Sequence, residues 1–82
     1  MLGPEHPHTL TSLHNMANLL KEQGKLEEAE ELFKRAVGAR ERVLGAKHPK
    51  TIKTKENLAK TLTSQGKYMQ ATAWYIKSLK VV

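Results

Sequence analysis

Apolar side chains recur along this chain at spacings of three and four residues, which place them on one face of an α-helix. Four such stripes follow one another, and Gly24 and Gly66 interrupt them where a helix could end in a left-handed glycine cap. Because strand-like alternation is lacking, the pattern predicts an all-α chain of four antiparallel helices. The stripes consist of Leu10, Leu13, Met16, Ala17 and Leu20; Leu26, Ala29, Leu32, Phe33, Ala36 and Val37; Ile52, Leu58, Ala59 and Leu62; and Tyr68, Ala71, Trp74, Tyr75 and Leu79.

The chain contains an internal repeat. The segment LGPEHPHT at residues 2–9 returns as LGAKHPKT at residues 44–51, a shift of 42 residues. Under the same shift 12 of 39 aligned positions are identical, and a fixed period of about 20 to 50 residues is typical of stacked repeats. We therefore predict one unit over residues 1–82, with repeat 1 at about 2–43 and repeat 2 at about 44–82, each a helix-turn-helix.

Small residues predict where the helices approach one another. Ala17 and Ala29 in repeat 1, and their counterparts Ala59 and Ala71, fall where a larger side chain would push two helix axes apart. Lys55 stands where repeat 1 has an apolar leucine, so we expect a gap in that stripe which the lysine stem covers only in part.

Composition excludes several classes of function. With 82 residues there is room for one small domain, and the absence of cysteine excludes disulfides, cysteine–zinc sites and thiol catalysis. No apolar run reaches the roughly 18 residues of a membrane span, and the N-terminus does not resemble a signal peptide. We therefore expect a cytoplasmic protein with no membrane partner.

The net charge of +6 is distributed unevenly, with −1 on residues 1–42 and +7 on residues 43–82. This asymmetry suggests an anionic partner, and a solvated lysine surface that serves solubility is the alternative. Eleven of the 14 basic residues are lysines, and they come without an aromatic platform or a glycine-rich phosphate loop. Nucleic acid is therefore not the expected partner.

The residues inside each unit resemble a known repeat family. The evidence consists of NMANLL at 15–20, QGKLEEAE at 23–30 and FKRAV at 33–37, echoed by NLA at 57–59, QGKY at 65–68 and Ala71. They resemble a tetratricopeptide repeat (TPR), and the 42-residue period with its LGPEHP connector resembles the kinesin light chain and nephrocystin-3 type. The resemblance implies a right-handed α–α superhelix, a TPR solenoid. His8 and Lys50 depart from the family, which carries an acid there, and so do Lys55 and Ser78.

The resemblance also implies a function, because first helices of successive units line a concave groove that holds a partner peptide. Asparagine side chains both donate and accept hydrogen bonds, which suits them to bind a peptide backbone. Lysines would attract an acidic linear motif, the ligand type that the resemblance suggests, although Glu22 and Glu56 on the same face reduce the local charge. The alternative is that this face is simply solvated. The expected peptide-binding residues are His14, Asn15, Asn18, Lys21, Lys53, Asn57 and Lys60, flanked by Thr11 and Ser64.

Self-assembly is a second hypothesis, because repeat stacks normally need at least three units and this sequence shows two. We expect the last helix to expose some of Trp74, Ile76, Leu79 and Val82, which would allow homo-oligomers or swapped helices.

Catalysis and metal binding have little support. The residues His6, His8 and His14 are close in sequence, but His6 recurs as His48 in the connector, which indicates a structural role such as helix capping. The chain contains no aspartate and no recognised catalytic motif. We therefore expect no enzyme activity, no metal site and no cofactor.

Overall fold

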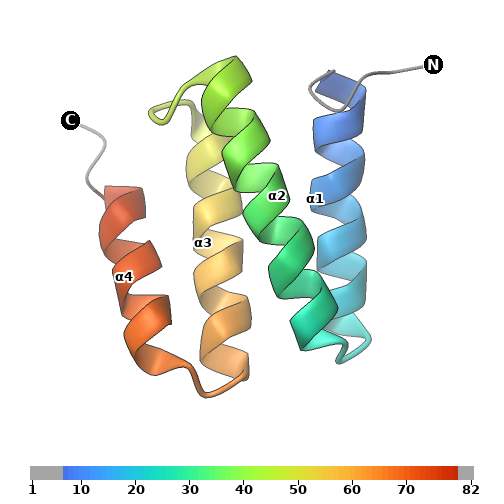
Figure 1. Cartoon of the computed structure of the whole chain (residues 1–82), viewed down its shortest axis with the longest axis vertical. Coiled ribbons are helices and arrows are strands. Elements are labelled where there is room, and N and C mark those ends of the chain that lie inside the picture. Colours follow the sequence, from blue (N-terminus) through green and yellow to red (C-terminus); the bar gives the residue numbers. More distant parts are fainter. Residues whose placement is uncertain (1–6, 80–82) are drawn as a thin grey trace.

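The structure, a computed structural model, describes residues 7–79 and consists there of four α-helices in sequence (Figure 1). They are α1 (Pro7–Glu22), α2 (Leu26–Leu44), α3 (Pro49–Ser64) and α4 (Tyr68–Leu79). The short connections force consecutive helices to run antiparallel. The sequence prediction of an all-α chain with four helices is confirmed.

The helix ends follow local sequence signals. Gly24 and Gly66 adopt φ values of 82° and 79°, which closes α1 and α3 with the left-handed conformation that glycine tolerates best. At the start of α3, the Nδ1 atom of His48 accepts a hydrogen bond from the backbone N–H of Lys50 at 3.1 Å. The expected capping role is thereby confirmed for His48, whereas its counterpart His6 lies outside the described residues.

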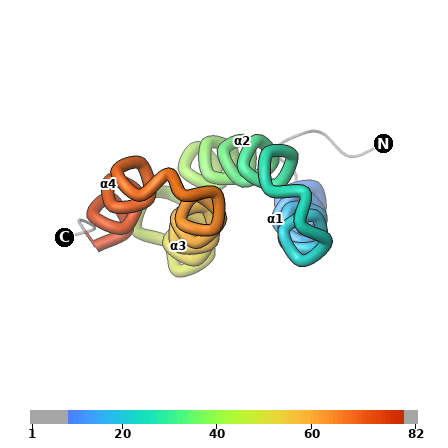
Figure 2. Tube along the Cα trace, turned by 90° about the horizontal axis from the view of Figure 1, so that it is seen from below, coloured from blue at the N-terminus to red at the C-terminus, as the bar shows by residue number. Residues whose placement is uncertain are grey.

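The helices are arranged with α1 and α3 on one side and α2 on the other, where α2 packs against both (Figure 2). Helix α4 packs against α3. Alanines at the close approaches are buried as the sequence indicated, and larger side chains fill the space around them. The resulting core runs through both repeats and comprises Ala17, Ala29, Phe33, Val37, Leu58, Leu62 and Ala71, with Leu20, Leu32 and Trp74 packed against it.

The core contradicts the sequence analysis at two points. Tyr68 and Tyr75 belong to the fourth apolar stripe but are exposed, because α4 has a neighbour on only one side within the described chain. Lys55 was expected to leave a gap in the third stripe, but the whole residue is only 5% exposed. Its ammonium group reaches the carboxylate of Glu41 at 3.9 Å, at a hollow that Lys55 helps to line.

The expected exposure of the last helix is confirmed for Ile76 and Leu79. Trp74 is half-buried against the core, and Val82 lies outside the described residues. None of the helices within residues 7–79 combines the length and the apolar character needed to cross a membrane.

Candidate functional site

The side chain of His14 joins the two first helices, α1 and α3. Its Nδ1 atom lies 3.2 Å from the hydroxyl of Thr54 on α3, and its Nε2 atom lies 3.2 Å from the amide nitrogen of Asn57, also on α3. The same Nε2 atom lies 3.3 Å from the amide nitrogen of Asn18, one turn further along α1. The rings of His14 and of Phe33 on α2 form a T-shaped pair with a centroid distance of 5.7 Å. His14 is therefore in contact with three helices.

The neighbours of His14 determine which of its ring nitrogens carries the proton. An amide nitrogen can only donate, so the two asparagine amides require Nε2 to be an acceptor without a hydrogen. The proton of the neutral ring then lies on Nδ1 and is donated to the Thr54 hydroxyl. That hydroxyl also accepts from Arg40 at 2.8 Å and donates to the carbonyl of Lys50 at 2.9 Å. The network is complete only with a neutral His14.

Electrostatics favours the same state. Burial lowers the pKa of His14, and the positive charges of Arg40 and Lys53 lower it further. Protonation would add a third positive charge beside Arg40 and Lys53. It would also place an N–H donor on Nε2, opposite the amide donors of Asn18 and Asn57. The residue is consequently neutral at physiological pH.

The predicted peptide-binding residues do not all meet. His14, Asn18 and Asn57 form one hydrogen-bonded row across α1 and α3, and Asn57 is only 7% exposed within it. Lys53 and Lys60 are exposed on α3, four residues before and three residues after Asn57, and therefore share its side of the helix. Lys21 is half-buried near the end of α1.

Asn15 is placed differently from its counterpart Asn57. It is exposed on α1, whereas Asn57 is buried against the preceding first helix. Since residues 42 apart hold equivalent positions, Asn15 faces the side of α1 that points away from α3. The two asparagines therefore do not form one pair.

Arg40 is a residue that the sequence analysis did not identify. It is buried on α2, and one of its terminal nitrogens donates to both the carbonyl of Lys50 at 3.0 Å and the hydroxyl of Thr54. These bonds satisfy backbone and side-chain groups at the beginning of α3 and tie it to α2. An arginine in a helix otherwise rich in charged residues gives no sequence signal for such burial.

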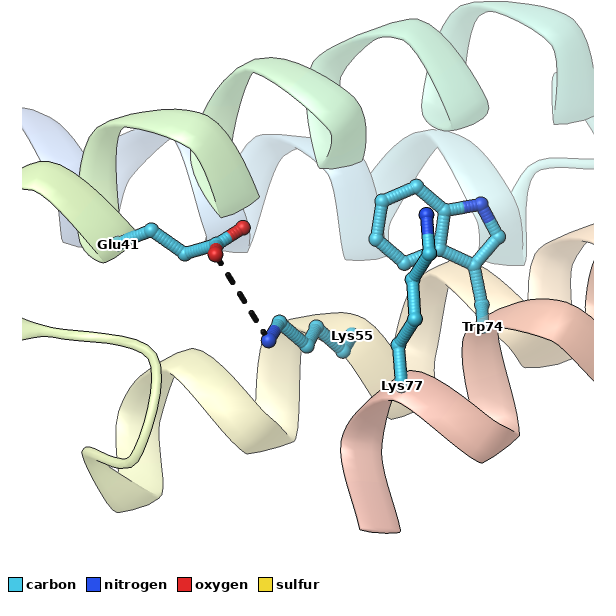
Figure 3. A pocket seen from close by; sticks show the side chains of 4 residues that line it. All are labelled: Glu41, Lys55, Trp74 and Lys77. Atoms are coloured by element: carbon cyan, nitrogen blue, oxygen red, sulfur yellow. Dashed lines mark ion pairs between the residues drawn. The ribbon is translucent and has the colours of Figure 1, made fainter. Parts of the chain in front are cut away.

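A hollow of about 310 Å³ opens between α2, α3 and α4 (Figure 3). It is lined by Glu41, Lys55, Trp74 and Lys77, and the Lys77 ammonium lies 4.4 Å from the centre of the Trp74 ring. None of these residues takes part in the hydrogen bonds of His14, so the hollow is distinct from the row around that residue. In the part of the chain that the structure describes, no three histidine or acidic side chains gather as metal ligands would.

Comparisons with known proteins agree with this geometry. A family model described as tetratricopeptide repeat matches residues 8–82. A crystal structure of nearly identical TPR-like repeats, assigned to a kinesin light chain of Podosopora anserina, superposes with a TM-score of 0.90 at 26% sequence identity. The match covers 99% of this chain and 38% of that one, so the chain spans less than half of its structural relative. Among curated protein sequences no match is found. The chain belongs to the tetratricopeptide repeat family, with repeats similar to those of kinesin light chains.

Proposed function

We propose that this chain is a non-catalytic interaction module that binds a partner peptide along the surface formed by α1 and α3. Tetratricopeptide repeats are generally protein–protein interaction modules, which supports a protein partner. The observation that carries the proposal is the polar row of His14, Asn18 and Asn57 across the two helices, with Lys53 and Lys60 exposed beside it. We name this surface the α1–α3 face.

The chemistry of the α1–α3 face favours an acidic ligand. Its exposed cations lie on α3, where Lys53 and Lys60 flank the buried amide of Asn57. Lysines at the rim of an interface attract carboxylates and mainly raise the rate of association. The amide of Asn57 already donates to His14, so it contributes to a ligand through the small edge that stays exposed. Lys60 is accordingly the residue best placed to test the charge.

The test uses a short fluorescein-labelled peptide of glutamates around one tryptophan, titrated with the 82-residue chain and followed by fluorescence anisotropy. We expect Lys60→Glu to weaken binding about fivefold, which corresponds to about 1 kcal/mol for an exposed charge pair. Lys47→Glu makes the same charge change in the loop between α2 and α3 and should weaken binding distinctly less. Equal losses in the two variants would show that only net charge matters and would reject the α1–α3 face.

Asn57→Ala provides a second variant for the same surface. It removes an amide that bridges to His14, so both peptide affinity and thermal stability should fall. A variant that binds the labelled peptide as tightly as the wild type would remove Asn57 from the proposed site.

Self-association is a second candidate function. The observation that favours it is the exposure of Tyr75 and Leu79 on α4, where apolar side chains meet solvent instead of a neighbouring helix.

A further inference from the structure

Residues 42 apart hold equivalent places in the two repeats, but several are buried in one repeat and exposed in the other. Phe33 and Val37 on α2 are fully buried beneath α3. Their counterparts on α4, Tyr75 and Leu79, are 38% and 77% exposed. Thr72 is likewise exposed where α2 carries the buried Glu30. We name the surface made by Thr72, Tyr75 and Leu79 the tail face.

The opposite end of the molecule shows the complementary difference. Leu58 and Thr61 on α3 are fully buried. Their counterparts on α1, Met16 and Leu19, are 56% and 54% exposed. Ser12 and Asn15 are exposed as well, whereas their counterparts on α3 are buried against α1 and α2. We name the surface made by Ser12, Asn15, Met16 and Leu19 the head face.

We propose that a second copy of this chain docks head to tail, with the tail face of one copy on the head face of the next. The register is the one in which α2 already packs on α3 inside the chain. The proposal rests on the self-association candidate above and adds to it the counterface and the register. It is continuous with an interface that the structure shows, because each face is the 42-residue counterpart of one half of that interface.

The apolar groups of the two faces match those of the internal interface. Inside the chain, the aromatic ring of Phe33 and the side chain of Val37 pack with Leu58 and Leu62 in one cluster. Between copies, Tyr75 and Leu79 would take the same places against Met16 and Leu20. Removing exposed apolar surface of this kind from water favours association.

Polar groups match too. Inside the chain, His14 joins α1 to Thr54 and Asn57 of the following first helix. The counterpart of His14 is Glu56, and the head face of the next copy presents the corresponding Ser12 and Asn15. A carboxylate accepts hydrogen bonds from both a hydroxyl and an amide nitrogen, so Glu56 replaces His14 with compatible chemistry.

Charge selects this arrangement over a symmetric one. A head-to-tail contact brings residues 43–82, with a charge of +7, against residues 1–42 of the next copy, with a charge of −1. A tail-to-tail dimer would bring two halves of +7 together, which like-charge repulsion disfavours. Two internal hydrogen-bonded contacts have no equivalent. Thr72 cannot replace the carboxylate of Glu30, which accepts from Gln65 and Lys67. The counterpart of Arg40 in the sequence is Val82, which cannot donate as Arg40 does to the start of α3. The contact between copies is therefore weaker than the internal one.

The contact has consequences for the size of the assembly. Because the two faces differ, each added copy offers a new free face, and the contact does not stop at a dimer unless it closes a ring. Light scattering after size-exclusion chromatography should show the average mass of the 82-residue chain rising above 9.2 kDa as concentration increases a hundredfold.

Two variants block one face each. Leu79→Glu places a charge on the tail face, and Leu19→Glu places one on the head face. Both positions are exposed in the single chain, so circular dichroism should show an unchanged helical fold. Each variant alone should stay at 9.2 kDa. An equimolar mixture should reach twice that mass and no more, because the intact head of one variant fits the intact tail of the other.

A matched control lies on the same helix as the tail face. Met69 is exposed on α4, but its counterpart Glu27 is also exposed, so neither belongs to a stacking face. Met69→Glu makes a comparable change from apolar to charged and should leave association as in the wild type. A wild-type chain that remains a monomer throughout would overturn both the proposal and the self-association candidate.

The remaining outcomes separate the proposals. Association of the wild type combined with a mixture that stays at 9.2 kDa would overturn the head-to-tail register alone. A loss of association by Met69→Glu equal to that by Leu79→Glu would overturn the assignment of the tail face. Titrating monomeric Leu79→Glu with the labelled acidic peptide tests the α1–α3 face independently, since Leu79 lies on α4 and outside that surface.

Discussion

His14 shows at the scale of one residue how a side chain can hold two repeats together. Its two ring nitrogens have opposite roles, since one accepts from two asparagine amides and the other donates to the Thr54 hydroxyl. Only the neutral ring with its proton on Nδ1 can do both. The junction between α1 and α3 therefore depends on the protonation state of a single imidazole.

We expect acid to weaken the fold through His14. Burial, with help from Arg40 and Lys53, lowers the pKa of His14 in the folded state below its ordinary value of 6.5. The unfolded chain therefore binds a proton first, and stability falls as pH drops below about 6.5. Urea unfolding followed by circular dichroism at pH 7.5 and 5.5 should give a lower midpoint at pH 5.5.

The control for this prediction is a variant that does not titrate. His14→Gln should be less stable than the wild type at pH 7.5 and should lose most of the dependence on pH between 7.5 and 5.5. His48→Gln should keep that dependence, since His48 caps the N-terminus of α3 through the backbone N–H of Lys50 and is not among the hydrogen-bond partners of His14. An unchanged pH dependence in His14→Gln would contradict the assignment.

Among the helices, α2 carries two features that can be tested separately. Gly38 lies in its interior, where the φ angle is ordinary and a methyl group would meet only the Arg42 guanidinium at 3.6 Å. Glu30, one turn from the beginning of the helix, connects α2 to the turn between α3 and α4. Gly38 lowers the intrinsic stability of α2. Glu30 stabilises the contact of α2 with the turn between α3 and α4.

Gly38→Ala should stabilise the protein by about 1 kcal/mol, because alanine loses less backbone entropy than glycine on entering a helix. A thermal melt should show a higher midpoint. The matched variant Gly24→Ala should lower it instead, since Gly24 has a φ of 82°, which strains any residue with a β-carbon. A lower midpoint for Gly38→Ala would mean that the helix cannot accommodate the methyl group beside Arg42.

Glu30 should contribute stability that disappears in acid. Burial raises the pKa of Glu30, but hydrogen bonds from Lys34, Gln65 and Lys67 outweigh it and lower the pKa to about 2. Stability is therefore complete above about pH 4.5 and is lost as pH falls from 4.5 toward 2. Since Lys34 and Lys67 are partly solvated, we expect Glu30→Gln to cost about 1 to 2 kcal/mol at pH 7.

The measurement for Glu30 is denaturant unfolding of the wild type and Glu30→Gln at pH 7 and at pH 3. The difference in free energy of unfolding should shrink markedly at pH 3, because the wild-type carboxylate begins to protonate and the unfolded reference is already neutral. A difference that stays constant would indicate a purely steric effect of the substitution.

At the scale of the whole molecule, the two repeats share one core. Phe33 and Val37 of repeat 1 pack with Leu58 and Leu62 of repeat 2, and α2 packs against both α1 and α3 (Figure 2). Truncating a fully buried aromatic side chain typically costs about 3 to 5 kcal/mol, a large part of the stability of a small domain. A core substitution on α2 should therefore also lower the stability of α4.

Phe33→Ala tests this coupling. The substitution is on α2, and the fluorescence of Trp74 reports from α4. Because one core joins them, the thermal transitions seen by circular dichroism and by Trp74 fluorescence should move down together, or both signals should be those of an unfolded chain. A Trp74 transition that keeps its wild-type midpoint while the helical signal shifts would show that the repeats unfold independently.

The candidate site was only partly predictable. His14, Asn18 and Asn57 were identified from their positions on the first helices, and the structure places these three together. The sequence could not separate Asn15 from Asn57, because the two occupy identical positions in the repeat. What distinguishes them is which helix lies beside each, and that depends on packing between repeats. Peptide binding by these residues stays a prediction.

Local patterns were sufficient for the architecture, since the periodicity of apolar residues, the glycines at helix ends and the alanines at close approaches act within a few residues of sequence. The sequence by itself therefore determined four antiparallel helices and their repeat. Only the tertiary structure decided that Arg40 and Lys55 are buried, that His14 joins three helices, and that Tyr75 stays exposed. The physical reason is that burial of a side chain depends on the neighbour across the interface, and neighbours 40 residues away leave no local pattern.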